Sequence, residues 1–472
     1  MTTPAPDPAP PGLYAPREPI FPKRVSGPFR SLKWAVMAVT LAIYYVTPWI
    51  RWNRGPDMPD QAVLVDLAGR RFFFFGIEIW PHEFHIVAGL LIMAGLGLFL
   101  FTAVLGRVWC GYACPQTVWT DLFIWVERLI EGDRNARIRL HRAPWGPRKA
   151  VLRVAKWAAW LVIAAATGGA WVFYFTDAPT LLRDLATLQA HPIAWATIGV
   201  LTATTFVFGG FAREQICIYA CPWPRIQAAM MDEDTLTVGY RAWRGEPRGK
   251  GAGAGDCIDC MACVSVCPTG IDIRDGQQLE CITCALCIDA CNQMMDRTGR
   301  PRGLIAYLAL SDETAERAGR PRRPMLRHIL RPRTLLYAGL WSGAGLLLAA
   351  AILTRAPVEM TVAPVRNPVF VTLSDGSVRN AYELRLRNKQ HHAATFQLGL
   401  DGAEAQIAVE NAADAQITVG PDRSLTQRVY LTAPPGSDLA QGGITGLALT
   451  VRDLDGPAHS RIDTIFHGRQ AR

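Results

Sequence analysis

The chain has 472 residues, more than one ordinary domain needs, so we expect several domains. Half of the residues are apolar and they stand in long blocks, which predicts membrane spans. The formal net charge is +9, but the basic residues gather beside the apolar blocks, where they orient spans. We therefore expect no binding to nucleic acid.

Residues 1–30 are rich in Pro and Ala and show no apolar periodicity, which predicts a disordered cytoplasmic tail. No small-residue cleavage site follows the first apolar block, so the start of the chain is not interpreted as a signal peptide.

Five apolar blocks have the length that crosses a bilayer core of about 30 Å. They cover residues 34–50, 86–106, 154–175, 193–211 and 335–353. Arginines and lysines crowd the segment 107–153 and the segment 320–333, which by the positive-inside rule are cytoplasmic. The N-terminus and the cysteine-rich segment described below are then cytoplasmic, and the C-terminal region lies outside. Buried helices of a soluble enzyme are the alternative.

A motif of the form C-x-Y-A-C-P occurs twice in residues 31–244, as Cys110–Pro115 and as Cys217–Pro222. Each copy follows the second apolar block of a pair. The first four spans are therefore predicted to form two parallel repeats about an axis along the membrane normal. Residues 118–130 carry a helical apolar stripe, which predicts a helix lying on the inner leaflet, with ordinary helix packing as the alternative.

The two motif copies place two cysteines four residues apart, a spacing that shares one face of a helix. The proline after the second cysteine favours the start of a new helix there, whose positive end stabilises thiolate. Four soft thiolates at one membrane depth suit Cu(I) or another soft metal, and a dithiol can also relay electrons. Buried structural cysteines are the alternative. The residues concerned are Cys110, Cys114, Cys217 and Cys221.

Eight further cysteines, between residues 257 and 291, spell C-x2-C-x2-C-x3-C twice. This is the spacing of a bacterial ferredoxin with two [4Fe–4S] clusters, in which the last cysteine of each motif binds the cluster of the other. One cluster is assigned to Cys257, Cys260, Cys263 and Cys291, and the other to Cys281, Cys284, Cys287 and Cys267. The alternatives are a double zinc site or reduced core thiols. The second motif departs from the pattern because Asn292, not proline, follows its last cysteine.

Composition divides the rest of the chain. The glycine-rich segment 245–255 predicts a flexible linker that opens a ferredoxin domain over residues 245–300. A basic cytoplasmic connector (301–334) and the fifth span (335–354) follow.

Residues 355–472 show short alternating segments punctuated by Gly, Asn, Asp and Pro, which predicts an immunoglobulin-like β-sandwich without the cysteine pair of antibody domains. The expected strands are 358–362, 369–373, 381–387, 395–400, 406–409, 416–419, 427–431, 446–451 and 461–466.

Two weaker candidates stand near the spans. His82, Glu83 and His85 could bind copper or contact a quinone, although polar residues at a membrane interface explain them as well. Met230 and Met231 could add thioether ligands to Cu(I), although packing explains them as well.

The order of spans, C-x3-C-P motifs, ferredoxin, fifth span and sandwich resembles the cytochrome c oxidase accessory proteins called CcoG, FixG or RdxA. The resemblance runs from about residue 20 to the C-terminus and includes the strings CPTGIDIRDG (267–276), GRPRG (299–303) and VTLSDGSVRN (371–380). It implies the inner membrane of a Gram-negative bacterium. It also implies a cupric reductase that delivers Cu(I) for assembly of cbb3-type cytochrome c oxidase. The eight ferredoxin cysteines would then hold the clusters, and the four C-x3-C-P cysteines would bind or reduce copper.

On this interpretation we expect two [4Fe–4S] clusters and copper, as substrate or bound ion. The expected partners are a cytoplasmic electron donor, a copper chaperone or transporter, assembly factors of the oxidase and, as an option, a second copy of the chain. Two other functions stay open at this point. One is a quinol-linked electron-transfer module, and the other is a non-catalytic assembly scaffold or redox sensor.

Overall fold

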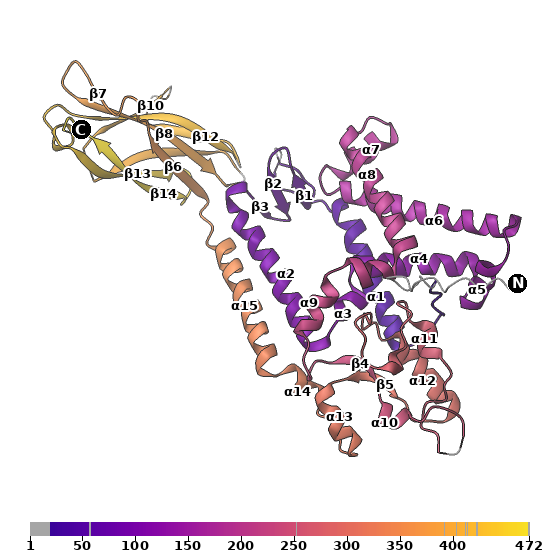
Figure 1. Cartoon of the computed structure of the whole chain (residues 1–472). Helices are drawn as coiled ribbons and strands as arrows, with labels where there is room; N and C mark the ends of the chain where they lie inside the picture. The colour runs from indigo at the N-terminus through magenta and orange to yellow at the C-terminus, as the bar shows by residue number, and fades with distance from the viewer. Residues whose placement is uncertain are drawn as a thin grey trace, which may run out of the picture. The chain divides into compact units, whose positions relative to one another are not determined.

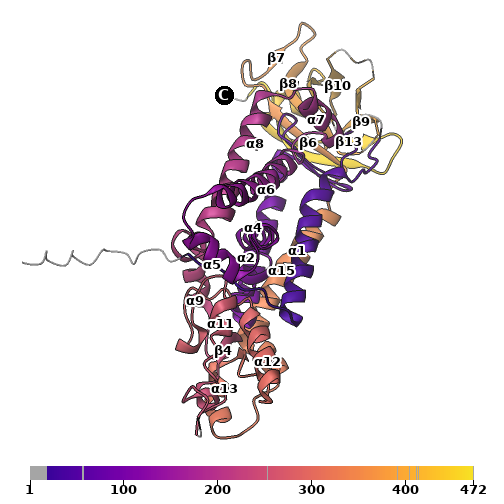
Figure 2. The same cartoon turned by 90° about the vertical axis from the view of Figure 1, so that its right-hand side faces the viewer.

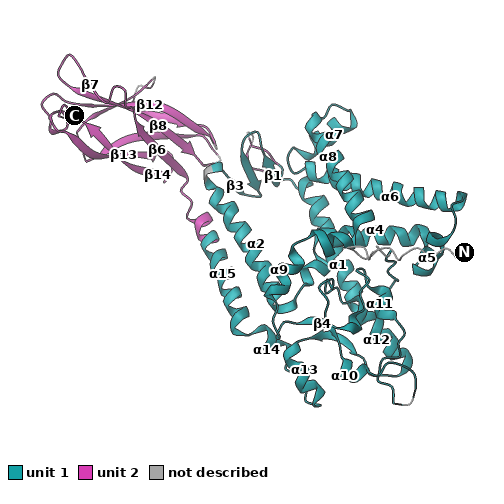
Figure 3. Cartoon of the chain, viewed as in Figure 1, with its two compact units in different colours: residues 1–51, 61–348 teal, residues 52–60, 349–472 magenta. Residues whose placement is uncertain are grey.

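The structure is a computed structural model (Figure 1) that describes residues 19–470 apart from 56, 57, 252, 391, 403, 411, 413 and 422. Residues 1–18 of the predicted tail lie outside the described residues. The chain forms two compact units, residues 1–51 with 61–348 and residues 52–60 with 349–472 (Figure 3).

Long helices form the frame of the first unit: α1 (Pro28–Val46), α2 (Phe84–Leu105), α6 (Pro147–Val172), α8 (Pro192–Thr205) and α15 (Pro332–Leu353). Four helices of the described chain are long and apolar enough to cross a membrane, namely α2, α6, α15 and α8 with its continuation to Ala212. The first predicted span, α1, is not among them, and its cations Arg30 and Lys33 are buried. The count of five spans therefore stays a prediction.

The two C-x3-C-P motifs lie in segments with the same succession of elements. After α2, Gly106 turns the chain with φ +58°, and α3 (Val108–Tyr112) and α4 (Pro115–Glu131) follow. After α8, a π-helical segment (Phe206–Ala212) ends at Arg213 with φ +36°, and a second one (Ile216–Ala220) leads into α9 (Trp223–Met230). The arrangement of these segments about a symmetry axis stays a prediction.

Helix α4 packs inside the unit, beside α5 (Arg134–Arg142) and α6 (Figure 2). The ring of Phe123 stacks on Trp160 of α6, with centroids 5.3 Å apart. Polar residues of α4 are buried too, because Asp121 meets Arg30 at 2.8 Å and Glu127 meets Lys156 at 3.5 Å. Val118, Phe123 and Val126 of the predicted apolar stripe thus pack inside the unit, whereas Trp125 and Leu129 are exposed. A position of this helix at the inner leaflet stays a prediction.

The ferredoxin segment is closed by two strands that the sequence did not predict, β4 (Thr237–Tyr240) and β5 (Ile305–Leu308), which pair antiparallel. Between and after them lie α10 (Ala242–Gly245), α11 (Ala262–Val266), α12 (Leu286–Thr298), α13 (Leu310–Arg317) and α14 (Met325–Ile329). The predicted linker folds back on this segment, because the Gly249 amide donates to Cys257 at 2.9 Å and the Gly255 amide donates to Pro247 at 2.8 Å. The segment is therefore held by backbone hydrogen bonds rather than extended as a spacer.

Between the first two long helices lies a small antiparallel sheet that was not predicted, of strands β1 (Val63–Asp66), β2 (Arg71–Phe74) and β3 (Ile77–Ile79). Helix α7 (Ala178–Ala186) lies between α6 and α8, and Asp177 caps it by accepting from the Thr180 amide at 3.2 Å.

The second unit is the predicted β-sandwich, and all nine expected strands are present. One sheet has the order β10–β12–β8–β6 with β7 on β8, and the other has the order β11–β9–β13–β14. Alternating residues of β8 and β9 fill the core between the sheets, and Tyr382 links them by donating to the Ile465 carbonyl at 2.8 Å. The strands are β6 (Val358–Pro364), β7 (Val371–Thr372), β8 (Val378–Asn388), β9 (Ala394–Asp401), β10 (Gln406–Val409), β11 (Gln416–Val419), β12 (Ser424–Ala433), β13 (Ile444–Asp453) and β14 (His459–His467), with α16 (Asp438–Gln441) before β13.

Candidate functional site

The two ferredoxin motifs fold the same way around their second cysteines. Asp259 and Met261 flank Cys260 with φ values of +54° and +56°, and Thr283 and Ala285 flank Cys284 with +55° and +58°. Non-glycine residues rarely adopt this left-handed conformation, and four at matching positions indicate a functional constraint. Turns of this kind aim backbone N–H groups into a concavity that suits an anionic iron–sulfur centre.

The cysteines predicted for the second cluster surround one small cavity. Its wall is otherwise mainly apolar and includes Ile271, Ile273 and Ile282. Cys263 from the first predicted set also lines it, so the two sets of thiols adjoin each other. The four predicted ligands in its wall are Cys267, Cys281, Cys284 and Cys287.

The cysteines predicted for the first cluster are also brought together. Cys257, Cys263 and Cys291 share one buried apolar cluster of side chains. Negative charge on Cys260 or on Cys257 would raise the pKa of Cys291, which places these thiols within electrostatic reach of one another. Cys260 is exposed, so this set lies nearer to solvent.

The donor sets fit iron–sulfur clusters. Burial raises the pKa of Cys263 and of Cys284 to about 12, and that of Cys291 to about 11. Such thiols are protonated near neutral pH, so they give up protons when they bind iron. Four soft sulfur donors around an apolar cavity match the coordination of a cubane cluster. The assignment of single cysteines to each cluster stays a prediction.

The four C-x3-C-P thiols lie within electrostatic reach of one another, although they come from two distant segments. Burial raises the pKa of Cys217 to about 12, and charges on Cys114, Cys110 and Cys221 would raise it further. Burial likewise raises the pKa of Cys110 to about 11, against the opposing effect of Arg107. The Cys110 thiol also donates to Gln227 of α9 at 3.1 Å.

The two cysteines of each C-x3-C-P pair do not lie on one face of a single helix, which their spacing had predicted. Cys114 lies beyond the end of α3 with ψ 128° and is the N-cap of α4, as predicted. Cys221 lies beyond its π-helical segment with ψ 124°, one residue before the N-cap Pro222, so the predicted cap is displaced by one residue. Each second cysteine is extended because a proline follows it.

The first C-x3-C-P motif lies directly on the second ferredoxin motif. A Cβ added to Gly111 would meet the Ile282 carbonyl oxygen at 2.6 Å and the Cys284 amide nitrogen at 3.0 Å. The Tyr112 hydroxyl donates to the Cys284 carbonyl at 3.2 Å. Cys110 packs against the buried cluster that includes Cys284. A predicted cluster ligand and a predicted copper ligand thus belong to one packed core.

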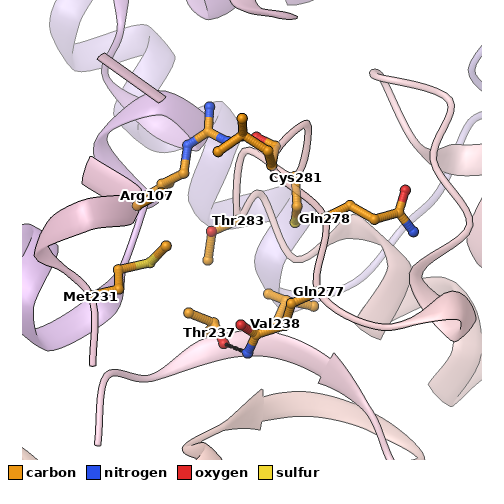
Figure 4. Close-up of a pocket in the computed structure, with 10 residues that line it drawn as sticks. Arg107, Met231, Thr237, Val238, Gln277, Gln278, Cys281 and Thr283 are labelled. Atoms are coloured by element: carbon orange, nitrogen blue, oxygen red, sulfur yellow. Dashed lines mark hydrogen bonds between the residues drawn. The ribbon is translucent and has the colours of Figure 1, made fainter. Parts of the chain in front are cut away.

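Arg107 lies between the same two groups of thiols. It donates to the Leu279 carbonyl and lines a cavity of about 180 Å³ together with Cys281 and Met231 (Figure 4). Its positive charge lowers the pKa of Cys110 and of Cys281 against the larger effect of burial. A cation at this place favours any state that carries more negative charge on either sulfur group.

The copper prediction is not matched by a formed ion site. Among the described residues, no group of three or more His, Cys, Asp or Glu side chains is placed to hold a single metal ion, and this holds for the ferredoxin cysteines as well as for the C-x3-C-P cysteines. Met231 packs against Gly106, with Sδ 3.2 Å from where a Cβ would stand. His85 lies in the first turn of α2, and the side chain of His82 is outside the described residues.

Comparison with known proteins assigns the family. Residues 212–310 match the 4Fe–4S dicluster domain, residues 86–132 match a 4Fe–4S binding domain, and residues 348–469 match the Ig-like fold at the C-terminus of FixG. The chain is 64% identical to protein RdxB of Cereibacter sphaeroides over 98% of this chain and 99% of that protein. The chain belongs to the FixG and RdxA family.

Two further relatives support this family assignment. Protein RdxA of Cereibacter sphaeroides is 64% identical, over 97% of this chain and 99% of that protein. The nitrogen fixation protein FixG of Rhizobium meliloti is 55% identical, over 90% of this chain and 88% of that protein. With its four apolar helices, this FixG-family chain is a membrane-bound iron–sulfur redox protein with two clusters and an Ig-like C-terminal domain.

Three residues of the site were not singled out from the sequence, namely Arg107, Gly111 and Gln227. Gly111 could have been predicted from the sequence, because a glycine between two motif cysteines permits a close backbone approach. Gln227 has no signal in the sequence, because its contact with Cys110 joins segments more than a hundred residues apart.

We predict that Gly111→Ala disturbs the second ferredoxin motif, because the new methyl group would overlap the Ile282 carbonyl. EPR of the reduced protein should show one cluster signal altered or lost, with the other retained. Gly169→Ala is the control, since nothing lies within 4 Å of its added Cβ. Unchanged spectra for Gly111→Ala would contradict the contact.

We predict that Arg107→Gln lowers the reduction potential of one cluster by on the order of 50 mV, because a positive charge near its sulfurs is lost. A redox titration followed by EPR measures this shift. Arg142→Gln, on exposed α5 surface, removes the same charge away from the cysteines and should leave both potentials in place. Equal shifts in the two variants would refute a local effect.

Proposed function

We propose that this FixG-family chain is a cupric reductase that serves the assembly of cbb3-type cytochrome c oxidase. Electrons from a cytoplasmic donor would enter at the ferredoxin segment and reach copper at Cys110, Cys114, Cys217 and Cys221. The observation that carries the proposal is the packing of the Gly111 backbone and the Cys110 thiol against the motif of Cys284.

The reduction of Cu(II) to Cu(I) needs one electron for each copper ion. Iron–sulfur clusters, when bound, accept and donate one electron at a time. Each Cu(II) that takes one electron becomes Cu(I), while the cysteine sulfurs keep their oxidation state. Cu(I) prefers soft sulfur donors, so binding to these thiols favours the reduced ion.

The chain's own residues support both transfer and binding. The contact between α3 and the second motif buries Gly111 and Tyr112 and packs the Cys110 thiol against the cluster that includes Cys284, which supports short electron transfer. Gln227 is 1% exposed and holds the Cys110 thiol in place, and its own amide donates to Thr102 of α2 at 3.2 Å. The raised pKa values of Cys110 and Cys217 mean that copper displaces protons from these thiols on binding.

Two segments of the chain bear on sidedness and partners. The basic residues of 107–153 and 320–333 support a cytoplasmic ferredoxin segment and a periplasmic Ig-like domain in the bacterial inner membrane. A copper chaperone or transporter would then exchange copper at the inner face. The Ig-like domain, in this proposal, contacts oxidase assembly factors, and the protein acts as a homodimer or alone.

We predict that the variant with both Cys110→Ser and Cys217→Ser loses copper reduction by at least about a hundredfold, because losing direct ligands costs more than losing their supporting partners. Anaerobic assay of Cu(I) formation with reduced protein measures the rate. Gly169→Ala is the control and should keep the rate, since nothing lies within 4 Å of its added Cβ.

Iron content and EPR of the same preparations show whether both clusters are retained. An unchanged rate in the double serine variant with intact clusters would contradict the copper role. A quinol-linked electron-transfer module or an assembly scaffold would then account for the chain better.

A further inference from the structure

A basic cleft of about 490 Å³ lies between α4, α5, the start of α6 and the segment 210–214. We call it the α5–α6 cleft. Five cations and two carboxylates line it, which leaves a net charge of +3 when His141 is neutral. Residues of both charges therefore line the cleft, and the cations outnumber the carboxylates. The cations are Arg137, Lys149, Arg153, Lys156 and Arg213, and the carboxylates are Glu127 and Glu214.

Arg137 is the most deeply buried of these cations, at 1% exposure. One of its N–H groups pairs with Glu127, and its guanidinium lies over the Phe21 ring with Cζ 5.3 Å from the centroid. Its Nε and Nη1 have no hydrogen-bond partner among the described residues. These two donors are enclosed by protein and the Phe21 ring covers the guanidinium, so Arg137 adds its positive charge to the wall of the cleft without offering an accessible donor.

The carboxylates around the cleft do not supply enough compensation. Glu127 already meets Arg137, Arg213 and Lys156, the last at 3.5 Å. Glu131, beside the cleft, meets Arg153 at 3.1 Å and Lys156 at 3.0 Å. Glu127 and Glu131 are thus shared by four cations, and Glu214 is a third carboxylate in the lining. Lys149 adds a fifth cation, held by the carbonyls of His141 and Ala143, so the whole group carries a net charge of +2.

The cleft lies at the end of a candidate membrane span. Lys149, Arg153 and Lys156 stand on one face of the first turns of α6, and the rest of this helix is apolar. Exposed indole rings flank them, Trp145 at 71% and Trp157 at 36% exposure. Cations and indoles at the end of a span mark the depth of the lipid headgroups.

We propose that the α5–α6 cleft binds the phosphate group of an anionic phospholipid. The phosphate oxygens accept hydrogen bonds from Arg153 and Lys149, with the buried charge of Arg137 behind them, and the acyl chains lie along the apolar surface of Trp157 and Phe211. A quinone has an uncharged headgroup and would leave the excess of cations around the cleft uncompensated. The bound lipid fixes α5 and α6 against α4, beside the segment that leads to Cys217.

The test uses the purified full chain in detergent with equal parts of phosphatidylglycerol and phosphatidylcholine, followed by native mass spectrometry. We expect the wild-type chain to retain phosphatidylglycerol in preference to phosphatidylcholine. The variant with Lys149→Gln and Arg153→Gln should bind phosphatidylglycerol about thirtyfold more weakly, since each cation contributes about fivefold.

Arg142→Gln is the matched control, because it removes one positive charge from the exposed end of α5 and is not a lining residue of the cleft. It should retain the lipid as the wild type does. Equal losses in the control and in the double variant, or no loss in either, would overturn the site. Iron content and visible absorption verify that each variant is folded.

Two outcomes with the wild-type chain decide the matter even if the double variant does not fold. Lack of preference for phosphatidylglycerol over phosphatidylcholine would overturn the proposal. Inorganic phosphate that binds as tightly as phosphatidylglycerol would also overturn it, because the anion would then come from solution and not from a lipid. Phosphate that competes only weakly supports the lipid.

Discussion

The close approach of the Gly111 backbone to the backbone of Cys284 is the contact on which the site depends. It brings a C-x3-C-P motif against a ferredoxin motif that lies 172 residues later in the chain, counted from Tyr112 to Cys284. A side chain at residue 111 would push the two segments apart, and the Tyr112 hydroxyl holds them together by donating to Cys284. The partly buried Cys110 thus packs against the apolar cluster that includes the predicted cluster ligand Cys284.

Charge is the second constraint on this part of the molecule. Asp121 and Glu127 are buried in α4 and each is paired with cations from other helices, Arg30 in the first case and Lys156 in the second. Truncating one partner of such a pair leaves a buried charge without compensation, which is strongly destabilising. These ion pairs explain why α4, whose apolar stripe also fits a membrane surface, packs between other helices.

Much of the architecture could be predicted from local sequence. Apolar blocks located four long helices, alternation located all nine strands of the sandwich, and cysteine spacing indicated the ferredoxin segment. The strands β4 and β5 could not be predicted, because each is four residues long and is defined by its pairing with the other. The same limit applies to Arg107, whose role depends on the packing of Leu279 and Cys281 beside it.

The most direct measurement of the central claim mixes the anaerobic, fully reduced protein with Cu(II) in a stopped-flow instrument. Cluster absorbance and Cu(I) formation are followed together. If electrons pass from the ferredoxin segment to the four C-x3-C-P thiols, cluster oxidation keeps pace with Cu(I), with one cluster electron for each ion reduced. Cu(I) that forms while the clusters stay reduced, or clusters that oxidise without forming Cu(I), would contradict the account.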